Sequence, residues 1–170
     1  MKIKSLFLNK SKIFVFLFLF TLTVLLIEVI FSIAGCKMVF QTDYSVNFRL
    51  GIMTKVNPEK IKKGDYVGFK FLAVPGDPRY GRLFVKIATC MPGEYVTYSV
   101  EDNTFYCNGT AVAKPKPYSK TGQRLYPFTY AGIVPEGKLF VTGETYHSYD
   151  SRYWGFIDED WIVGKVYKIF

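Results

Sequence analysis

The sequence predicts a mainly β domain that follows a single N-terminal membrane helix. The 170-residue chain opens with a long apolar run, and behind it Gly and Pro separate short apolar segments from one another. Aromatic residues, which favour strands, make up 18% of the chain. Short β-prone segments between turn residues are typical of all-β folds. The length suffices for one membrane segment and one domain with its own core.

The apolar run covers residues 13–34. As a helix with a rise of about 1.5 Å per residue, it reaches about 33 Å, which is enough to cross the core of a bilayer. More lysines precede the run than follow it closely, so the positive-inside rule places residues 1–12 in the cytoplasm and the domain, residues 35–170, outside. We expect a single-pass protein of the inner (cytoplasmic) membrane with a periplasmic or other extracytoplasmic domain. The lysines are Lys2, Lys4, Lys10 and Lys12 before the run and Lys37 after it.

A removable signal peptide is the alternative for the same run. Its end, Ile33-Ala-Gly-Cys36, is similar to a lipoprotein processing site, and an anchored lipoprotein adhesin would be acylated at Cys36 and lose residues 1–35. The run is longer than the roughly 7–15 apolar residues of a signal-peptide core, which favours a retained anchor. Both alternatives attach the domain to a membrane.

The charge of the chain argues against a nucleic-acid partner. The net charge is +8, but residues 35–170 keep 18 of the 22 basic and 13 of the 14 acidic residues, a net charge of +5. A mildly basic domain favours an anionic membrane surface. No basic run is combined with a recognition motif, so no nucleic acid is expected to bind.

Strands are expected where apolar and β-branched residues gather between turns. From Ser45 to Leu50 polar and apolar residues alternate, as they do in a half-buried strand or extended segment. Lys86 interrupts an otherwise apolar strand, and such a lysine either points to solvent from an edge strand or is buried as a neutral amine. Residues 113–127 are basic, polar and Pro-containing, which predicts an irregular insertion. Further strands are expected at 66–69, 83–90, 95–100, 104–108, 138–142 and 161–167.

Two cysteines stand near a predicted hairpin. Residues 95–108 are expected to form this hairpin with its turn at Glu101-Asp-Asn103. Cys90 and Cys107 occupy positions that the hairpin can bring together, and outside the cytoplasm two such cysteines tend to form a disulfide. Three free cysteines are the alternative.

The densest group of polar side chains lies between Gly143 and Gly155. Because β-prone runs flank it, we expect a loop that is held by the sheet on both sides, and such loops commonly carry a site. The alternative is a long β-hairpin in which Asp150 and Arg152 pair for structure alone.

The sequence leaves few catalytic groups to choose from. It has no CxxC, no cysteine spacing that suits a metal and no Gly-rich phosphate loop, so neither a metal nor a cofactor is expected. The only histidine, His147, lies in the polar loop, where a lone histidine is usually solvated. Ser45 and Lys86 remain, and this pair suffices for acyl transfer if the lysine amine is neutral. Lowering a lysine pKa from about 10.4 to about 8 costs about 3 kcal/mol, and the apolar neighbours of Lys86 favour that shift.

Several segments, taken in order, carry a family resemblance. They are Ser45-Val-Asn-Phe-Arg-Leu, Lys63-Gly-Asp-Tyr-Val, Phe84-Val-Lys-Ile-Ala, Met91-Pro-Gly-Glu, Asn108-Gly, Val134-Pro-Glu-Gly-Lys-Leu-Phe-Val, the Gly143–Gly155 loop and Ile162-Val-Gly-Lys. Together they resemble type I signal peptidases, and their arrangement is most similar to the TraF-type conjugative-transfer signal peptidases, which process pilin precursors. The resemblance covers nearly all of the chain behind the anchor and implies a signal-peptidase-like β-barrel or sheet domain.

The resemblance also implies roles for five residues. Ser45 matches the nucleophile, and its backbone N–H would stabilise the oxyanion. Lys86 matches the general base, and Ser148 matches the serine that orients this lysine. Asp150 and Arg152 match the pair that braces the site.

The implied substrate is a precursor protein that lies extended along the strands near the nucleophile. Val46, Phe84 and Val85 are expected to bind it, with shallow apolar pockets for small residues before the cut. The resemblance thus implies a membrane-anchored Ser-Lys endopeptidase that cleaves the leader of a secreted precursor. The implied precursor is a pilin of a conjugative-transfer system, which is a type IV secretion system. The conjugation machinery is the implied partner of the enzyme. Some TraF-type relatives also join the new pilin end to its other terminus. A catalytically inactive scaffold of a conjugation or secretion apparatus is the alternative.

Some positions depart from the family pattern. Asp43 lies two residues before the nucleophile, where many signal peptidases have a serine that helps bind the oxyanion, and a negative charge there opposes that role. Asn47 replaces a common proline, Ile87 a frequent arginine, and Glu144-Thr145 the usual Asp-Asn. These departures indicate a divergent member.

Overall fold

The structure of the protein, a computed structural model, describes residues 10–170, with side chains from residue 11 onward. The expectation that residues 1–12 are cytoplasmic therefore falls mostly on residues outside the described part of the chain. The chain divides into two compact units, one ending at Lys37 and one covering Met38–Phe170.

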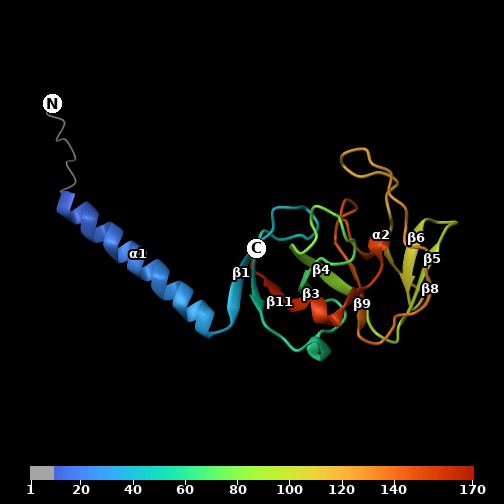
Figure 1. Cartoon of the computed structure of the whole chain (residues 1–170), viewed down its shortest axis with the longest axis horizontal. Helices are drawn as coiled ribbons and strands as arrows, with labels where there is room; N and C mark the ends of the chain where they lie inside the picture. Colours follow the sequence, from blue (N-terminus) through green and yellow to red (C-terminus); the bar gives the residue numbers. More distant parts are fainter. Residues whose placement is uncertain (1–9) are drawn as a thin grey trace. The chain divides into compact units, whose positions relative to one another are not determined.

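The first unit is a long apolar helix, α1 (Lys10–Ile33), drawn in blue in Figure 1. Its residues from Ser11 to Ile33 are long and apolar enough to cross a membrane. Apolar side chains are exposed all around this helix within its own unit, which suits a lipid environment better than water. The helix ends where Gly35 adopts a φ of +65°, a conformation that favours glycine. The helix thus begins three residues before, and ends one residue before, the range expected for the anchor, 13–34.

The second unit consists of two antiparallel sheets (Figure 1), which confirms the predicted mainly β class. The larger sheet, in spatial order, contains β1 (Cys36–Phe40), β2 (Leu50–Thr54), β11 (Ile162–Lys168), β3 (Tyr66–Lys70), β4 (Leu83–Cys90), β9 (Lys138–Thr142) and β10 (Ile157–Asp158). The smaller sheet contains β7 (Thr110–Ala113), β6 (Thr104–Cys107), β5 (Tyr95–Ser99) and β8 (Ala131–Ile133). Three short helices, η1 (Pro58–Lys60), α2 (Ser151–Trp154) and η2 (Glu159–Trp161), connect the strands.

One edge of β4 is only partly paired. On one side β4 pairs with β3 along its length from Leu83 to Ile87. On the other side it pairs with β9 only from Ile87, which lies opposite Thr142. The chain then leaves β9 at Gly143, so among the described strands Leu83–Lys86 has no partner on this side. This segment is called the free edge of β4 below.

Two local expectations are corrected. The alternating segment from Ser45 is not a strand, because the chain bends there and β2 begins only at Leu50. The Gly143–Gly155 loop does not join β9 to β11, as the flanking runs suggested, but leads from β9 to β10, which pair as antiparallel neighbours, so a long hairpin does form, with the shorter strand β10. The loop contains α2, whose N-cap is Asp150.

A disulfide joins the two sheets. The predicted hairpin of β5 and β6 forms, and it brings Cys107 of β6 next to Cys90 of β4 with their Cα atoms 5.8 Å apart. Both cysteines are fully buried in a cluster with Val96, Phe105 and Phe140. The sheet that carries Lys86 is thereby fixed to its neighbour.

Candidate active site

A large cleft opens at the segment between β1 and β2, residues 41–49, which is called the nucleophile loop below after the role expected for Ser45. Its volume is about 1200 Å³, and Ser45 contributes to its wall. Phe84 and Val85, at the free edge of β4, line it as well, whereas Val46 borders a smaller pocket and packs into the core. The cleft is therefore wide enough for an extended peptide beside both Ser45 and the lysine-bearing strand.

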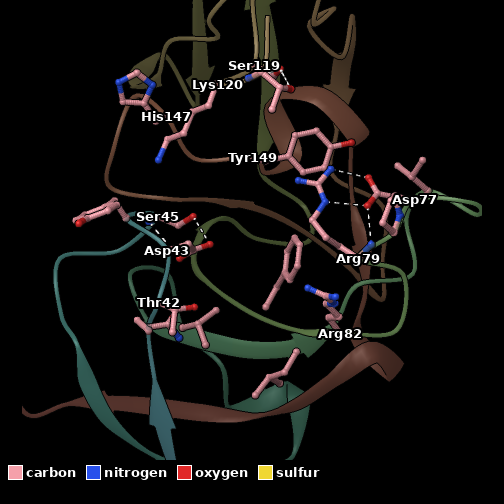
Figure 2. Close-up of a pocket in the computed structure, with 18 of the residues that line it drawn as sticks. Thr42, Asp43, Ser45, Asp77, Arg79, Arg82, Ser119, Lys120, His147 and Tyr149 are labelled. Atoms are coloured by element: carbon pink, nitrogen blue, oxygen red, sulfur yellow. Dashed lines mark hydrogen bonds and ion pairs between the residues drawn. The ribbon is translucent and has the colours of Figure 1, made fainter. Parts of the chain in front are cut away.

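The hydroxyl and the backbone N–H of Ser45 both donate to one carboxylate, that of Asp43. Its Oγ donates to Asp43 Oδ2 over 2.9 Å, and its backbone N–H donates to Asp43 Oδ1 over 3.3 Å, as the dashed lines in Figure 2 show. Ser45 is 5% exposed, whereas Asp43 is exposed to solvent. Asp43 thus occupies the two donors that an acyl-transfer reaction would use.

Lys86 is buried among apolar side chains. It is 2% exposed and lies directly across from Val67 in the β3–β4 pair, on a face that also carries Phe84 and Ala88. Its Nζ is 5.4 Å from the centroid of the Phe84 ring. No hydrogen bond or ion pair of this amine is found among the described residues, including Ser45. The alternative in which the Lys86 amine points to solvent from an edge strand is thus wrong.

This burial lowers the pKa of the Lys86 amine below its ordinary value of 10.5. The carboxylates of Asp43 and Asp150 raise it in part, and the guanidinium groups of Arg152 and Arg79 lower it further. Among the charged groups, Asp43, the carboxylate that holds Ser45, has the largest influence on the pKa of this amine. An amine with a lowered pKa is a better base near neutral pH.

The nucleophile loop is held in place by residues that lie about a hundred positions later. The backbone N–H of Glu144 donates to Ser45 O over 2.8 Å, and Thr145 Oγ1 donates to Tyr44 O over 2.6 Å. The Glu144 carboxylate accepts from the backbone N–H of Asn47 and, over 2.9 Å, from the hydroxyl of Tyr66. Burial and this carboxylate raise the pKa of Tyr66 to about 12. We call Glu144 and Thr145 the loop clamp.

Ser148 lies beside Ser45, whose loop is held by the loop clamp. It is 1% exposed, and its Oγ has no hydrogen-bond partner among the described residues. A Cβ placed on Gly143 would come within 2.2 Å of Ser148 Oγ and 2.5 Å of Ser45 O, so glycine is required there. The structure therefore brings Ser45 and Ser148 together, and the hydroxyl of Ser148 is free to bind a neighbouring donor or acceptor.

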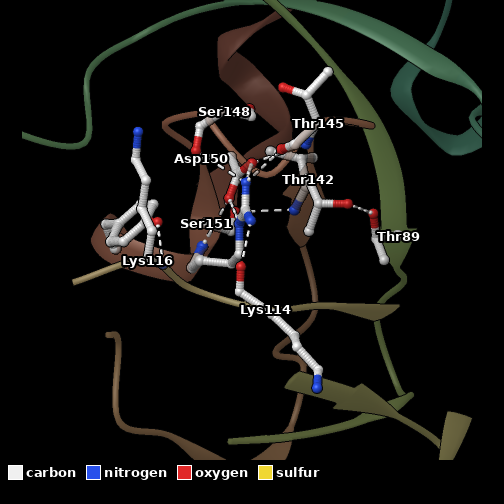
Figure 3. A network of polar contacts seen from close by, with 12 residues as sticks. Thr89, Lys114, Lys116, Thr142, Thr145, Ser148, Asp150 and Ser151 are labelled. Carbon is white, nitrogen blue, oxygen red and sulfur yellow. Dashed lines mark hydrogen bonds and ion pairs between the residues drawn. The ribbon is translucent and has the colours of Figure 1, made fainter. Parts of the chain in front are cut away.

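Asp150, labelled in the polar network of Figure 3, forms a buried ion pair with Arg152 that shapes the loop. Arg152 Nε lies 2.7 Å from Asp150 Oδ1, and the two side chains are 2% and 0% exposed. The guanidinium also donates to the carbonyl oxygens of Lys114, Thr145 and Ser148. Asp150 accepts from the backbone N–H of Gly143 and of Arg152, which caps α2. The pair thus braces the loop from inside.

Sequence reasoning missed one wall of the cleft. Asp77 and Arg79 form a bidentate ion pair, and the Arg79 guanidinium stacks over the ring of Tyr149 at 4.1 Å (Figure 2). Asp77 and Arg79 come from the Pro/Gly-rich loop between β3 and β4. The composition of this segment indicated a loop but did not show that it lines the cleft. Lys116 was also missed; it lines the cleft, is 7% exposed and lies 3.4 Å from His147 Nδ1.

The acidic and sulfur-containing side chains outside the cleft do not indicate a metal centre. Glu94 lies near both Cys90 and Cys107, a grouping that has suitable ligand atoms. The two sulfur atoms are bonded to each other, however, and Glu94 forms an ion pair with Lys63 over 2.8 Å. In this state the sulfur atoms are not thiolate ligands.

This chain matches a known protein family. The model of the family described as signal peptidase, peptidase S26, matches residues 10–170. The chain belongs to this family. The signal peptidase I homologues of the family are serine endopeptidases. The resemblance seen in the sequence is thereby confirmed at the level of the signal peptidase family.

Individual signal peptidases match parts of the chain. Signal peptidase I V of Bacillus subtilis (strain 168) is 36% identical over 96 residues, which are 50% of this chain and 56% of the relative. Signal peptidase I of Bacillus caldolyticus is 34% identical over 94 residues, 49% of this chain and 50% of the relative. The chain thus spans about half the length of the curated relatives it matches. The crystal structure of a signal peptidase I from Enterococcus faecalis V583 covers 62% of this chain and 96% of its own, with 29% identity and a TM-score of 0.41.

Proposed function

We propose that this protein is a membrane-anchored serine endopeptidase that removes leader segments from exported precursor proteins. Ser45 is the nucleophile and Lys86 the general base. The observation that carries the proposal is the buried Lys86 amine, whose pKa is lowered by desolvation and, among charged groups, is influenced most by the carboxylate bonded to Ser45. Ser45 in turn opens onto the cleft.

The proposed reaction proceeds in two acyl-transfer steps. Ser45 Oγ attacks the scissile carbonyl carbon while its proton passes to Lys86 Nζ, and the Ser45 backbone N–H binds the developing oxyanion. The C–N bond then breaks, and Lys86 returns the proton to the leaving amine. Water, deprotonated by Lys86, hydrolyses the serine ester and releases the free carboxyl end. An amine in place of water would instead join two peptide ends, as in pilin cyclisation.

The substrate is proposed to bind as an added strand. The free edge of β4 leaves the main-chain groups of Leu83–Lys86 without a strand partner on the side of β9. Leu83, Phe84 and Val85 line the cleft, so an extended peptide can pair there and reach Ser45. Main-chain pairing accepts many sequences, while the shallow apolar wall favours small side chains near the cut. Ser148, Asp150 and Arg152 are proposed to orient Lys86 and the loop.

The precursor is proposed to be a pilin of a conjugative-transfer system. This choice rests on the arrangement of motifs along the sequence, which is most similar to the TraF-type enzymes. The proposal includes an inner-membrane location, with α1 as the single span and the catalytic domain on the periplasmic or outer side, where the Cys90–Cys107 disulfide is stable.

The test uses the full-length protein in detergent micelles with two precursors, a conjugative pilin precursor and a general secreted precursor. The wild type is expected to cleave the pilin precursor, and Ser45→Ala and Lys86→Met are expected to lose at least about a thousandfold in rate, since each removes half of the reacting pair. Thr42→Ala, a neighbouring hydroxyl exposed in the same cleft, serves as the matched serine-like control.

Mass spectrometry of the products separates the alternatives. Cleavage with a water-derived carboxyl end supports hydrolysis, and loss of one water from the product supports cyclisation. Full transfer function with both Ser45→Ala and Lys86→Met would instead support a scaffold role and rule out the dyad. Equal cleavage of both precursors would remove the pilin assignment and keep the peptidase.

A further inference from the structure

Ser45 is held by Asp43 in a way that conflicts with the reaction. A serine nucleophile must give its proton to the base, yet the Ser45 hydroxyl donates to Asp43 Oδ2. The oxyanion must accept the Ser45 backbone N–H, yet that N–H donates to Asp43 Oδ1. One carboxylate therefore occupies both groups, and a second negative oxygen cannot share the same N–H without repulsion.

We propose that Asp43 is a gate on the nucleophile: its carboxylate locks Ser45 in a resting state, and an incoming substrate strand must displace it before acylation. This inference rests on the proposed peptidase function and names a positioning residue within the same site.

The contacts around Ser45 show that the Asp43 side chain can move while the backbone of the loop cannot. The loop clamp fixes the backbone of the nucleophile loop, because Glu144 N–H binds Ser45 O and Thr145 Oγ1 binds Tyr44 O. The Asp43 side chain, in contrast, is exposed, and its bonds to Ser45 are its only hydrogen bonds among the described residues. Rotation of one side chain into solvent thus frees both donors while the backbone stays in place.

The gate also acts on the base. The negative charge of Asp43 raises the pKa of Lys86, against the lowering by burial, so the resting carboxylate favours the protonated and inactive amine. The other charges that influence Lys86 are Asp150, Arg152 and Arg79. Asp150 and Arg152 neutralise each other in a buried pair, and Arg79 is paired with Asp77, so Asp43 is the charge that substrate binding can displace.

The test compares the wild type with Asp43→Asn, Asp43→Ser and a control, Asp160→Asn, which removes an exposed carboxylate of η2. Two rates are measured on the full-length protein in micelles. One is kcat/KM for cleavage of a precursor. The other is acetylation of Ser45 by p-nitrophenyl acetate, located by peptide mass spectrometry with Ser45→Ala as the blank.

Asp43→Asn is expected to raise both rates about tenfold, since a surface hydrogen bond to a charged group is worth on the order of a factor of ten. Asp43→Ser is expected to raise cleavage at least as much, because its hydroxyl can donate to the oxyanion. The ascending limb of the pH–rate profile is expected to move to lower pH in both variants, as the pKa of Lys86 falls. Asp160→Asn is expected to match the wild type.

Other outcomes overturn the gate in distinct ways. Slower acetylation and cleavage in Asp43→Asn would make Asp43 itself the base or a needed anchor. Equal rates and an unmoved pH profile would make it a bystander, with the peptidase intact. If no protein is acetylated at Ser45 and none cleaves a precursor, the proposed function fails together with the gate.

Discussion

The most unusual residue of the domain is a lysine that is buried in its larger sheet. Lys86 is 2% exposed and has only apolar cross-strand neighbours such as Val67. Burial of an ammonium group without a counter-ion in contact is costly, so the amine gives up its proton more readily than in water. The residue therefore destabilises the fold in exchange for a base that works near neutral pH.

Lys86→Met is expected to stabilise the protein by about 2 kcal/mol at neutral pH while abolishing cleavage, because an apolar chain of similar length fills the same space. The pKa of Lys86 is lower in the folded state than the 10.5 of the free side chain. The unfolded chain therefore binds the extra proton between these two values, so wild-type stability should rise with pH across that window.

Thermal unfolding of the full-length wild type and variant in micelles checks this expectation. The gap in unfolding temperature between them should narrow as the pH approaches 10.5. A variant that is less stable than the wild type at every pH would show that Lys86 stabilises the fold.

At the residue scale, the sequence identified candidate residues for the site more readily than the hydrogen bonds that these residues form. Strand composition left two alternatives open for Lys86, an amine in solvent or a buried amine, and the structure has the buried one. The hydrogen bond between Ser45 and Asp43 was not expected. It depends on a bend of the chain, whereas the alternating pattern of residues 45–50 had predicted an extended segment. The unpartnered hydroxyl of Ser148 likewise has no signature in the sequence.

At the scale of elements, the loop clamp connects two segments that are far apart in the chain. Glu144 binds Asn47 N–H and the Tyr66 hydroxyl, and its own N–H binds Ser45 O. The nucleophile loop contains no helix or strand of its own between β1 and β2. Its geometry thus depends on a loop that follows β9.

Glu144→Ala is expected to lower the cleavage rate about tenfold and the free energy of unfolding by about 1 kcal/mol, because its carboxylate loses one hydrogen bond to the nucleophile loop, at Asn47, and one to β3, at Tyr66. Tyr66→Phe is the matched control, since it removes only one of these two bonds and should have the smaller effect on both quantities. Cleavage kinetics and urea unfolding measure the two changes. Wild-type cleavage by Glu144→Ala would show that the backbone contact to Ser45 suffices.

Sequence reasoning located most strands and failed at their connections. The hairpin of β5 and β6 and the strands β3, β4, β9 and β11 lie where apolar runs between turns predicted them. The pairing of β9 with β10 was missed, because β10 has only two residues and carries no periodicity. The short helix α2 was missed for the same reason, although Asp150 before Ser151 is a common helix cap.

At the scale of the whole domain, the Cys90–Cys107 disulfide links the sheet that bears Lys86 to the smaller sheet. Cys90 is four residues from Lys86 on β4, about 13 Å along the strand. The crosslink therefore stabilises the domain without touching the cleft.

The double variant Cys90→Ser, Cys107→Ser is expected to lose about 3 kcal/mol of unfolding free energy, the loop-closure effect for cysteines 17 residues apart. Cleavage well below the unfolding temperature should be retained. Urea unfolding measures the first quantity, and Cys36→Ser serves as the control because Cys36 is free. Loss of cleavage in a folded double variant would mean that the crosslink also sets the position of Lys86.

The free edge of β4 has a practical consequence for inhibition. An unpaired run of backbone amides and carbonyls recognises a ligand by its shape as a straight ribbon and hardly at all by what that ribbon carries. A stiff amide-bearing mimetic with minimal substituents and a terminal electrophile aimed at the hydroxyl should therefore be held firmly, and substitutions in side chains would give the enzyme few routes to resistance.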